Sequence, residues 1–142
     1  MSLTTYLVDA SVVASHLIVD VFTANADTLF AELEKSVSLF VPEFCIVECT
    51  NVIWKQVRFH SMPQNEAEIL AQQLASLPLN YIPTEDVLLR ALQIGLAHKL
   101  AIYDSVYIAL AEKYGYPLLT ADARQETAAK TIGVTIKPIT DF

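Results

Sequence analysis

The chain has 142 residues, of which 54% are apolar and 18% charged, and its formal net charge at pH 7 is −7. This length and composition predict one domain, residues 1–142, which buries roughly 70% of the surface that the unfolded chain exposes. The acidic balance argues against a protein that coats nucleic acid with a basic surface. No apolar run reaches the ~18 residues of a membrane helix, and no secretory signal is recognisable, so we expect a cytoplasmic protein without a membrane segment.

Short apolar strands alternate with helical segments along the chain. The pattern predicts strands at 5–8, 38–41, 79–82 and 116–120, and leaves open a fifth at 134–136. It predicts helices at 12–18 with Ser11 as cap, at 27–35, from Pro42 to about 58, from Pro63 to about 76, after Thr84, and from Asp104 to 114. Strands separated by helices indicate a three-layer α/β/α domain with a central, mostly parallel sheet of four or five strands.

The two cysteines, Cys45 and Cys49, lie four residues apart in a predicted helix. On one helical face this spacing makes a mutual disulfide an awkward bridge, and it is a weak zinc pattern without a second Cys or His pair nearby. We interpret both as small buried thiols. The histidines His16, His60 and His98 lie outside the acidic motifs described next, and we interpret them as surface or packing residues.

Four acidic residues each stand in an otherwise apolar stretch: Asp9 in TYLVDAS, Glu48 in FCIVECTN, Asp104 in AIYDSVYIAL and Asp122 in PLLTADAR. Charged side chains are rarely buried unless they are paired or bind metal. Asp9 and Asp122 follow predicted strands, and open α/β sheets bind ligands at the carboxyl ends of their strands. Close carboxylates repel each other, and a hard cation such as Mg²⁺ or Mn²⁺ relieves this repulsion. The four acids therefore predict a site for one or two divalent ions.

Such a site suits hydrolysis of a phosphodiester bond. One metal ion generates hydroxide and a second stabilises the leaving oxygen of an in-line displacement, so that no histidine base is needed. Ser11, Asn51 and Thr120 lie two or three residues from an acid and could orient a metal ligand, or could serve as caps and turn residues. A polyanionic substrate would also need local cations, for which the candidates are Lys55, Arg58 and His60 after Glu48, and Arg124 and Lys130 after Asp122.

Simpler readings of the same residues remain open. Asp104 and Asp122 could be helix caps, and Asp9 could hold a turn through Ser11. A haloacid-dehalogenase-like phosphatase would place an acid or Thr two residues after Asp9, where Ser11 stands, and a receiver domain would place adjacent acids there. A further alternative is a module with the same fold that serves interaction or regulation without catalysis.

Three segments, LVDASVV, PEFCIVECTNVIWK and IYDSVYIALAEKYGYPLLTAD, resemble in order the signatures of PIN domains, above all the short prokaryotic VapC-type members. The resemblance covers nearly the whole chain. It implies a Mg²⁺- or Mn²⁺-dependent endoribonuclease that cleaves single-stranded or structured RNA. It also implies that the catalytic, metal-binding acidic quartet is the set Asp9, Glu48, Asp104 and Asp122. Thr120 and Asn51 match polar residues that often accompany the last acid and the glutamate.

Many VapC-type proteins are toxins held inactive by a small antitoxin, and many form homodimers, so the resemblance implies both partners. Apolar residues around the first helix could include such a surface, although we expect most of them in the core: Val12, Val13, Leu17, Val19, Val21 and Phe22. The chain departs from the family pattern at one place. Many relatives have a hydrophobic residue, commonly Phe, shortly after the last acid, whereas this chain has Ala-Arg-Gln-Glu at 123–126, and we expect the local loop to differ.

Overall fold

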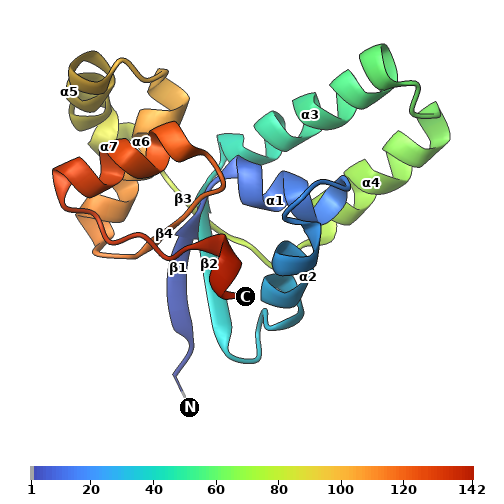
Figure 1. The fold of residues 1–142 in the computed structure, drawn as a ribbon, viewed down its shortest axis with the longest axis horizontal. Helices are drawn as coiled ribbons and strands as arrows, with labels where there is room; N and C mark the ends of the chain where they lie inside the picture. Colours follow the sequence, from blue (N-terminus) through green and yellow to red (C-terminus); the bar gives the residue numbers. More distant parts are fainter. Residues whose placement is uncertain (1) are drawn as a thin grey trace.

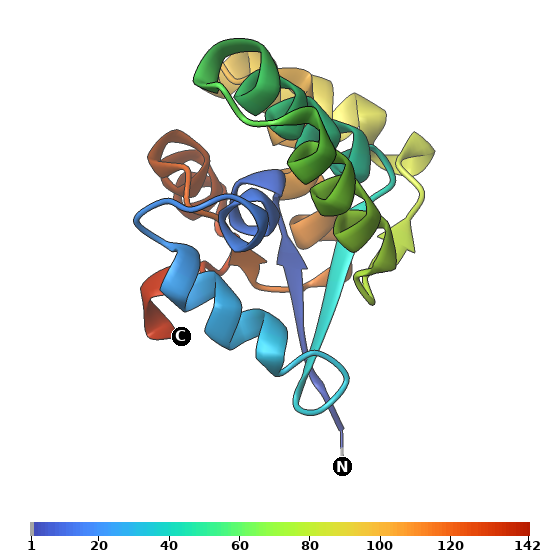
Figure 2. The same cartoon turned by 90° about the vertical axis from the view of Figure 1, so that its right-hand side faces the viewer.

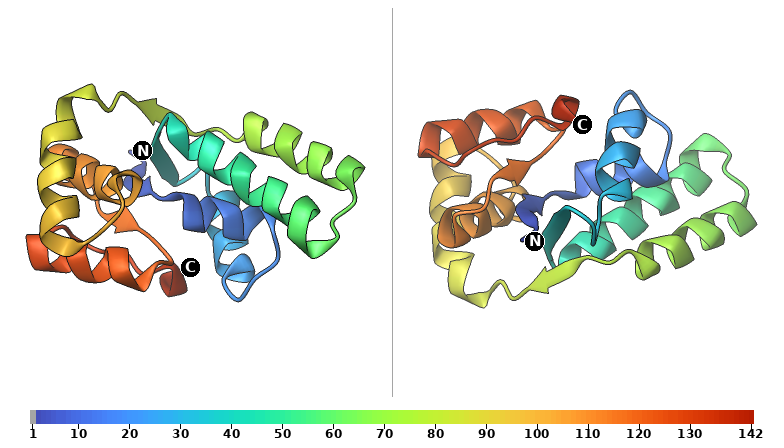
Figure 3. Two further views of the ribbon diagram at one scale, coloured as in Figure 1. Left: turned by 90° about the horizontal axis from the view of Figure 1, so that it is seen from above. Right: turned by 90° about the horizontal axis from the view of Figure 1, so that it is seen from below.

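The structure, a computed structural model, describes residues 2–142. Its centre is a parallel sheet in the order β3-β2-β1-β4, formed by β1 (Thr4–Val8), β2 (Val37–Pro42), β3 (Asn80–Ile82) and β4 (Leu118–Leu119). One layer of helices contains α1 (Ala10–Leu17), α2 (Thr23–Ala31), α3 (Phe44–His60) and α4 (Gln64–Ser76). The opposite layer contains α5 (Leu88–His98), α6 (Ile102–Tyr114) and α7 (Ala123–Ile132) (Figure 1, Figure 3). The predicted three-layer α/β/α architecture is confirmed.

The core lies on both faces of the sheet. Leu7 and Val8 of β1 and Leu39 and Val41 of β2 are fully buried, as expected of parallel strands that are covered on both sides. Helix α6 is buried from Ser105 to Ala111, which explains why this segment is apolar almost all round. Figure 2 shows α3 and α4 as an antiparallel pair that extends along one side of the molecule. Within residues 2–142 no single helix is long and apolar enough to cross a membrane. The segments Glu85–His98 and Ile102–Tyr114 reach that length and apolar composition only when they are combined, and a bend of 118° separates them.

The order of the strands places the ends of β1 and β4 side by side. Leu7 pairs with Leu118 and Val8 with Leu119, and the Asp9 N–H donates to the Leu119 carbonyl at 3.1 Å. From β1 the chain moves outward through β2 to β3, and then returns across the other face to β4. A sheet of this kind binds ligands where the direction of winding reverses, at the carboxyl ends of the strands. The first and last of the four acids therefore lie at the position that this rule selects.

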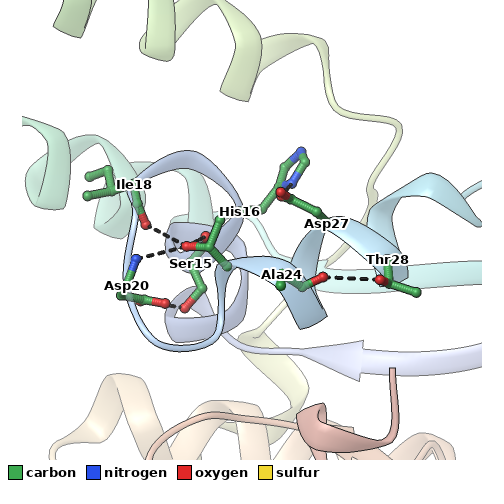
Figure 4. Close-up of polar contacts among 8 residues, drawn as sticks. Ser15, His16, Ile18, Asp20, Ala24, Asp27 and Thr28 are labelled. Carbon is green, nitrogen blue, oxygen red and sulfur yellow. Dashed lines mark hydrogen bonds and ion pairs between the residues drawn. The ribbon is translucent and has the colours of Figure 1, made fainter.

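The connection between α1 and α2 is held by polar contacts (Figure 4). The Ser15 hydroxyl donates to Asp20 Oδ2 at 2.7 Å, the Thr23 hydroxyl donates to the Ser15 carbonyl at 2.8 Å, and His16 Nδ1 lies 2.8 Å from Asp27 Oδ1. These contacts start α2 at Thr23, so the predicted helix at 27–35 is wrong in its bounds. Its predicted end is wrong because Glu34 adopts a positive φ of 66°, which turns the chain into β2.

Five further details of the predicted elements differ in the structure. Asp9 rather than Ser11 caps α1, and Pro42 ends β2 instead of opening α3. The fourth strand is only two residues long, and the fifth predicted strand is reduced to a single bridge between Leu118 and Ile136. Thr84 precedes a short 3₁₀ turn, η1 (Glu85–Val87), and makes no side-chain capping bond there. A second 3₁₀ turn, η2 (Ile139–Asp141), lies near the end of the chain.

The apolar residues around α1 divide into core and surface. Val12 and Val13 are fully buried, whereas Val19 and Val21 in the loop that follows α1 are 88% and 85% exposed. Leu17 and Phe22 are partly buried and pack against the core. Of these six residues, only Val19 and Val21 are exposed enough to contact a partner.

Candidate functional site

Asp9 lies directly after β1, and its buried carboxylate caps α1. Oδ1 accepts from the Ser11 N–H at 3.1 Å, the Ser11 hydroxyl at 2.5 Å and the Val12 N–H at 3.4 Å, while Oδ2 accepts from the Thr120 hydroxyl at 2.6 Å. Only 3% of the residue is exposed. This burial raises the pKa of Asp9 from 3.8 to about 6, although the hydrogen bonds from Ser11, Thr120 and Val12 act in the opposite direction; the charge of Asp122 raises it further.

Asp122 follows β4 and caps α7 in the same way that Asp9 caps α1. Its Oδ1 accepts from the Arg124 N–H at 2.8 Å and the Gln125 N–H at 3.2 Å, and its own N–H donates to the Thr120 hydroxyl oxygen at 3.0 Å. The Ser11 hydroxyl oxygen accepts from the Ala121 N–H at 3.0 Å. The hydroxyls of Ser11 and Thr120 therefore join the end of β1 to the end of β4.

Asp104 lies in the first turn of α6 and is partly buried. Burial is the main cause that raises the pKa of its carboxyl, and the negative charge of Asp122 raises it further. The guanidinium of Arg124 lowers the pKa in part. Asp104 and Asp122 therefore lie close enough to repel each other, and Arg124 is the cation that moderates this repulsion.

Glu48 lies in the second turn of α3 and faces α6. Its Oε1 accepts from the Tyr107 hydroxyl at 2.7 Å. Burial raises the pKa of Glu48, the hydrogen bond from Tyr107 lowers it, and the charge of Asp104 raises it again. Tyr107 is 1% exposed and packs edge-on against Phe44, with ring centroids 5.5 Å apart, so its hydroxyl is fixed in place.

The charges of the four acids act on one another in pairs, and we call this set of neighbouring carboxylates the acid row. Electrostatic repulsion couples Asp9 to Asp122, Asp122 to Asp104, and Asp104 to Glu48. Within residues 2–142 no three His, Cys, Asp or Glu side chains are already gathered closely enough to enclose a metal ion. Two causes keep the carboxylates apart. Thr120 and Tyr107 hold Asp9 and Glu48 in place through separate hydrogen bonds. In addition, negatively charged side chains repel one another when no cation lies between them. An all-oxygen, mutually repelling donor set fits a hard divalent cation such as Mg²⁺ or Mn²⁺.

The remaining predicted residues lie outside this row. Asn51 is exposed, and in the described part of the chain its side chain makes no hydrogen bond to Glu48. Lys55 and Arg58 are exposed further along α3, and Arg58 lies over the Phe59 ring at 5.3 Å. Arg124 is exposed at the start of α7, where its Nη2 donates to the Lys99 carbonyl at 2.9 Å.

The cations sort into paired and free groups. Lys130 pairs with Glu126 at 2.9 Å along α7. Among residues 2–142, by contrast, Lys55, Arg58 and Arg124 take part in none of the ion pairs, so their charges remain available to an anion.

The cysteines and His16 are structural. Both thiols are free and buried, and Cys49 Sγ lies 3.7 Å from the Ala10 carbonyl oxygen. The neighbouring Cys45 thiol and burial together raise the pKa of Cys49. His16 stacks on Phe30 at 4.2 Å between ring centroids. The interpretation of these three residues from sequence is confirmed.

Two polar residues at the site were missed by sequence reasoning. Tyr107 looked like part of an apolar helix, although its position three residues after Asp104 places it on the same helical side as that acid. Gln125 belongs to the segment at which the chain departs from the family pattern. No loop follows Asp122, because α7 starts at once at Ala123, and Gln125 points back into the protein with 1% of its surface exposed.

Comparisons with known proteins place this geometry in a family. A family model described as the PIN domain matches residues 6–131. Ribonuclease VapC3 of Pyrobaculum aerophilum is 29% identical over 118 residues, 82% of this chain and 88% of the relative. Ribonuclease VapC12 of Mycobacterium tuberculosis is 29% identical over 102 residues, 72% of this chain and 78% of the relative.

Solved structures show the same fold. PAE2754 of Pyrobaculum aerophilum superposes with a TM-score of 0.73 at 21% identity, covering 97% of this chain and 85% of its own. The Mycobacterium tuberculosis toxin VapC20, described as cleaving the sarcin-ricin loop, gives 0.67 at 17% identity over 87% and 94% of the two chains. A toxin–antitoxin complex of Klebsiella pneumoniae gives 0.56 at 13% identity over 93% and 96%. With the family model spanning most of its length, this chain belongs to the PIN domain family.

Proposed function

We propose that this chain is an endoribonuclease that uses a divalent metal ion held by Asp9, Glu48, Asp104 and Asp122, and that residues 1–142 form a single domain. The observation that carries this proposal is the row of four mutually repelling carboxylates at the switch point of the sheet, three of which have a raised pKa. A row of this kind is electrostatically unfavourable unless a cation compensates it. The curated relatives named as ribonucleases support the choice of chemistry.

The chain's own residues prepare the site for phosphodiester hydrolysis. Thr120 and Ser11 hold the Asp9 carboxylate, and Tyr107 orients Glu48. When bound, Mg²⁺ or Mn²⁺ supplies an activated water and neutralises charge on the scissile phosphate. We expect one or two ions, since four carboxylates spread along a row can serve either number.

Binding of an RNA substrate requires a local positive surface on this acidic chain. The net charge of −7 repels a polyanion, so that binding must depend on local cations. Arg124 lies beside the acid row, and Lys55 and Arg58 lie further along α3, which also carries Glu48. We propose that these three side chains contact RNA phosphates on either side of the scissile bond.

Protein partners are expected as well. Exposed Leu89, Leu92 and Leu96 follow helical spacing along α5, with exposures of 70%, 47% and 74%, and Val19 and Val21 add a second apolar surface. Such faces suit a small antitoxin or a second copy of the chain. The likeness to a toxin–antitoxin complex supports the antitoxin, and we propose a cytoplasmic toxin that is a homodimer and is restrained by that partner.

The test is cleavage of end-labelled RNA by the purified protein in Mg²⁺ or Mn²⁺, with EDTA as the metal-free arm. Asp104→Asn should keep the fold, because it removes one charge from a repelling row, and should lose cleavage by two orders of magnitude or more. Asp86→Asn is the matched control, since Asp86 is an exposed acid 3.2 Å from Lys113 and outside the row. RNA that spans the sarcin-ricin loop is a suitable first substrate, because VapC20 is described as cleaving that loop.

Calorimetric titration with Mn²⁺ separates a selective enzyme from an inactive module. Binding of Mn²⁺ without cleavage would leave the nuclease intact and direct the search to other RNA substrates. Absence of both binding and cleavage would contradict the proposed function and favour a PIN-fold module for interaction or regulation.

A further inference from the structure

Gln125 is a buried amide that bridges two elements of the acid row. It lies in the first turn of α7 and is 1% exposed. Its Nε2 donates to the Asp104 carbonyl at 2.9 Å, and its Oε1 lies 3.1 Å from the Thr120 hydroxyl, whose single proton is shared between this oxygen and Asp9 Oδ2. A buried amide costs several kcal/mol unless its polar atoms find partners, and here each end lies within hydrogen-bond distance of one.

The bridge is not an ordinary helix cap. An Asp at the N-cap followed three residues later by Gln resembles a capping box, in which the Gln side chain would accept from the N–H of the capping residue. In this structure the Asp122 N–H donates instead to the Thr120 hydroxyl oxygen at 3.0 Å. Gln125 is thereby free of the capping function, and its side chain reaches α6 instead.

The amide adds a hydrogen-bonded link between groups that, in the described part of the chain, are otherwise joined only by the charge of Arg124. The Thr120 hydroxyl contacts Asp9 Oδ2 at 2.6 Å, so Asp9, Thr120 and Asp122 form one hydrogen-bonded group at the ends of β1 and β4. Asp104 belongs to α6, and its charge and that of Asp122 repel each other. Within residues 2–142, the side chain of Gln125 is the only one that donates a hydrogen bond to Asp104, and it does so at the main-chain carbonyl.

We propose that Gln125 is a positioning residue that fixes the spacing between Asp104 and the group formed by Asp9, Thr120 and Asp122. This inference rests on the proposed metal-dependent function. Without the bridge, repulsion between Asp104 and Asp122 would let the first turns of α6 and α7 separate. With it, three acids are held at one spacing before any cation arrives, which is the supporting role that residues behind metal ligands commonly have.

The experiment is Mn²⁺ titration by calorimetry of the wild type and of Gln125→Met, which keeps the volume of the side chain and removes both hydrogen bonds. Loss of a residue that supports metal ligands typically weakens metal affinity by roughly 10–100-fold, and we expect a loss in this range. Cleavage of RNA should show a lower kcat with little change in KM, because the cations that contact RNA are unaltered.

The matched control is Ala129→Gly, which loosens α7 at a fully buried position away from the acid row. At temperatures where Ala129→Gly is folded, its Mn²⁺ affinity should lie within twofold of that of the wild type. The control therefore shows whether the Gln125 variant loses affinity through the position of Asp104 or through a less stable α7. If Gln125→Met does not fold, Gln125→Asn is measured in its place, since it keeps a buried amide that is too short to span both contacts.

The outcomes separate the two proposals. A wild type that binds Mn²⁺ together with a folded Gln125 variant of equal affinity would overturn the positioning role and leave the proposed function standing. A wild type that binds no Mn²⁺ would overturn both. A loss of affinity equal to that of Ala129→Gly would also overturn the inference, because it would show that Gln125 acts only through the stability of α7.

Discussion

Burial of Asp9 makes the stability of the metal-free protein depend on pH in a specific direction. The pKa of this carboxyl rises from 3.8 in the unfolded chain to about 6 in the folded protein. Between these values the folded protein binds more protons than the unfolded chain, so stability falls as pH rises through the interval. At about 1.4 kcal/mol per pKa unit, the ionised carboxylate destabilises the apo protein by about 3 kcal/mol at pH 7.

Asp9→Asn isolates this contribution. The amide has the shape of the carboxylate, and its Nδ2 can donate to the Thr120 hydroxyl oxygen, whose own proton is then available to Gln125 Oε1. We expect the variant to be more stable than the wild type by about 2–3 kcal/mol at pH 7 and nearly equal at pH 4, which corresponds to roughly 3 °C in Tm per kcal/mol for a chain of this size.

The assay is urea denaturation in EDTA at pH 4, 5, 6 and 7, with Asp86→Asn as the control for removal of an exposed acid. The difference between Asp9→Asn and the wild type should grow steadily with pH, whereas that of the control should stay within about 0.5 kcal/mol. A constant difference across the pH range, or a variant that is the less stable protein at pH 7, would refute the reasoning.

Three other outcomes follow from the site. Thr120→Val removes the donor to Asp9 and the acceptor for the Asp122 N–H, and should cost about 2 kcal/mol in urea denaturation at pH 7, whereas Thr120→Ser should recover most of it. Tyr107→Phe should raise the pKa of Glu48 further, which NMR titration of the Glu48 carboxyl would detect; an unchanged pKa would show that the hydrogen bond is weak. Mn²⁺ at about 100 times its Kd should raise the free energy of unfolding of the wild type by about 2.7 kcal/mol, and by clearly less in Asp104→Asn, as thermal denaturation would show.

The sequence predicts most of the fold because its clearest patterns, the apolar strands, reflect burial in the folded protein. The strands at 5–8, 38–41 and 79–82 lie within one residue of β1, β2 and β3. The first two were recognisable because a sheet covered on both faces requires mostly apolar central strands. Gly115 ends α6 with a φ of 69°, as a C-terminal glycine is expected to do. The errors concern segments whose bounds depend on distant side chains. Thr23 starts α2 through hydroxyl contacts to Ser15 and Ile18, which helical spacing alone does not reveal.

The candidate site divides in the same way. The four acids were recognisable because a charge in an apolar stretch needs a reason, and in the structure their charges repel one another in pairs. Their role as metal ligands stays a prediction. Asn51 was selected by its spacing from Glu48, but its side chain is exposed and, within residues 2–142, makes no hydrogen bond to that residue. Tyr107 and Gln125, by contrast, were not selected from the sequence but contact the acids in the structure. Their polar atoms reach across to other elements, 59 and 21 residues away in sequence, so only the tertiary structure identifies them.

The buried thiols of Cys45 and Cys49 have a practical consequence for following this protein in solution. Both are shielded from reagents, and the raised pKa of Cys49 keeps that sulfur in its unreactive thiol form. The native cysteines of the wild-type chain should therefore react little during site-directed labelling. A single cysteine introduced at the exposed position of Gln73 on α4 would accept a fluorophore or spin label selectively. The α3–α4 pair could then be monitored while RNA or a protein partner binds, without first replacing either native cysteine.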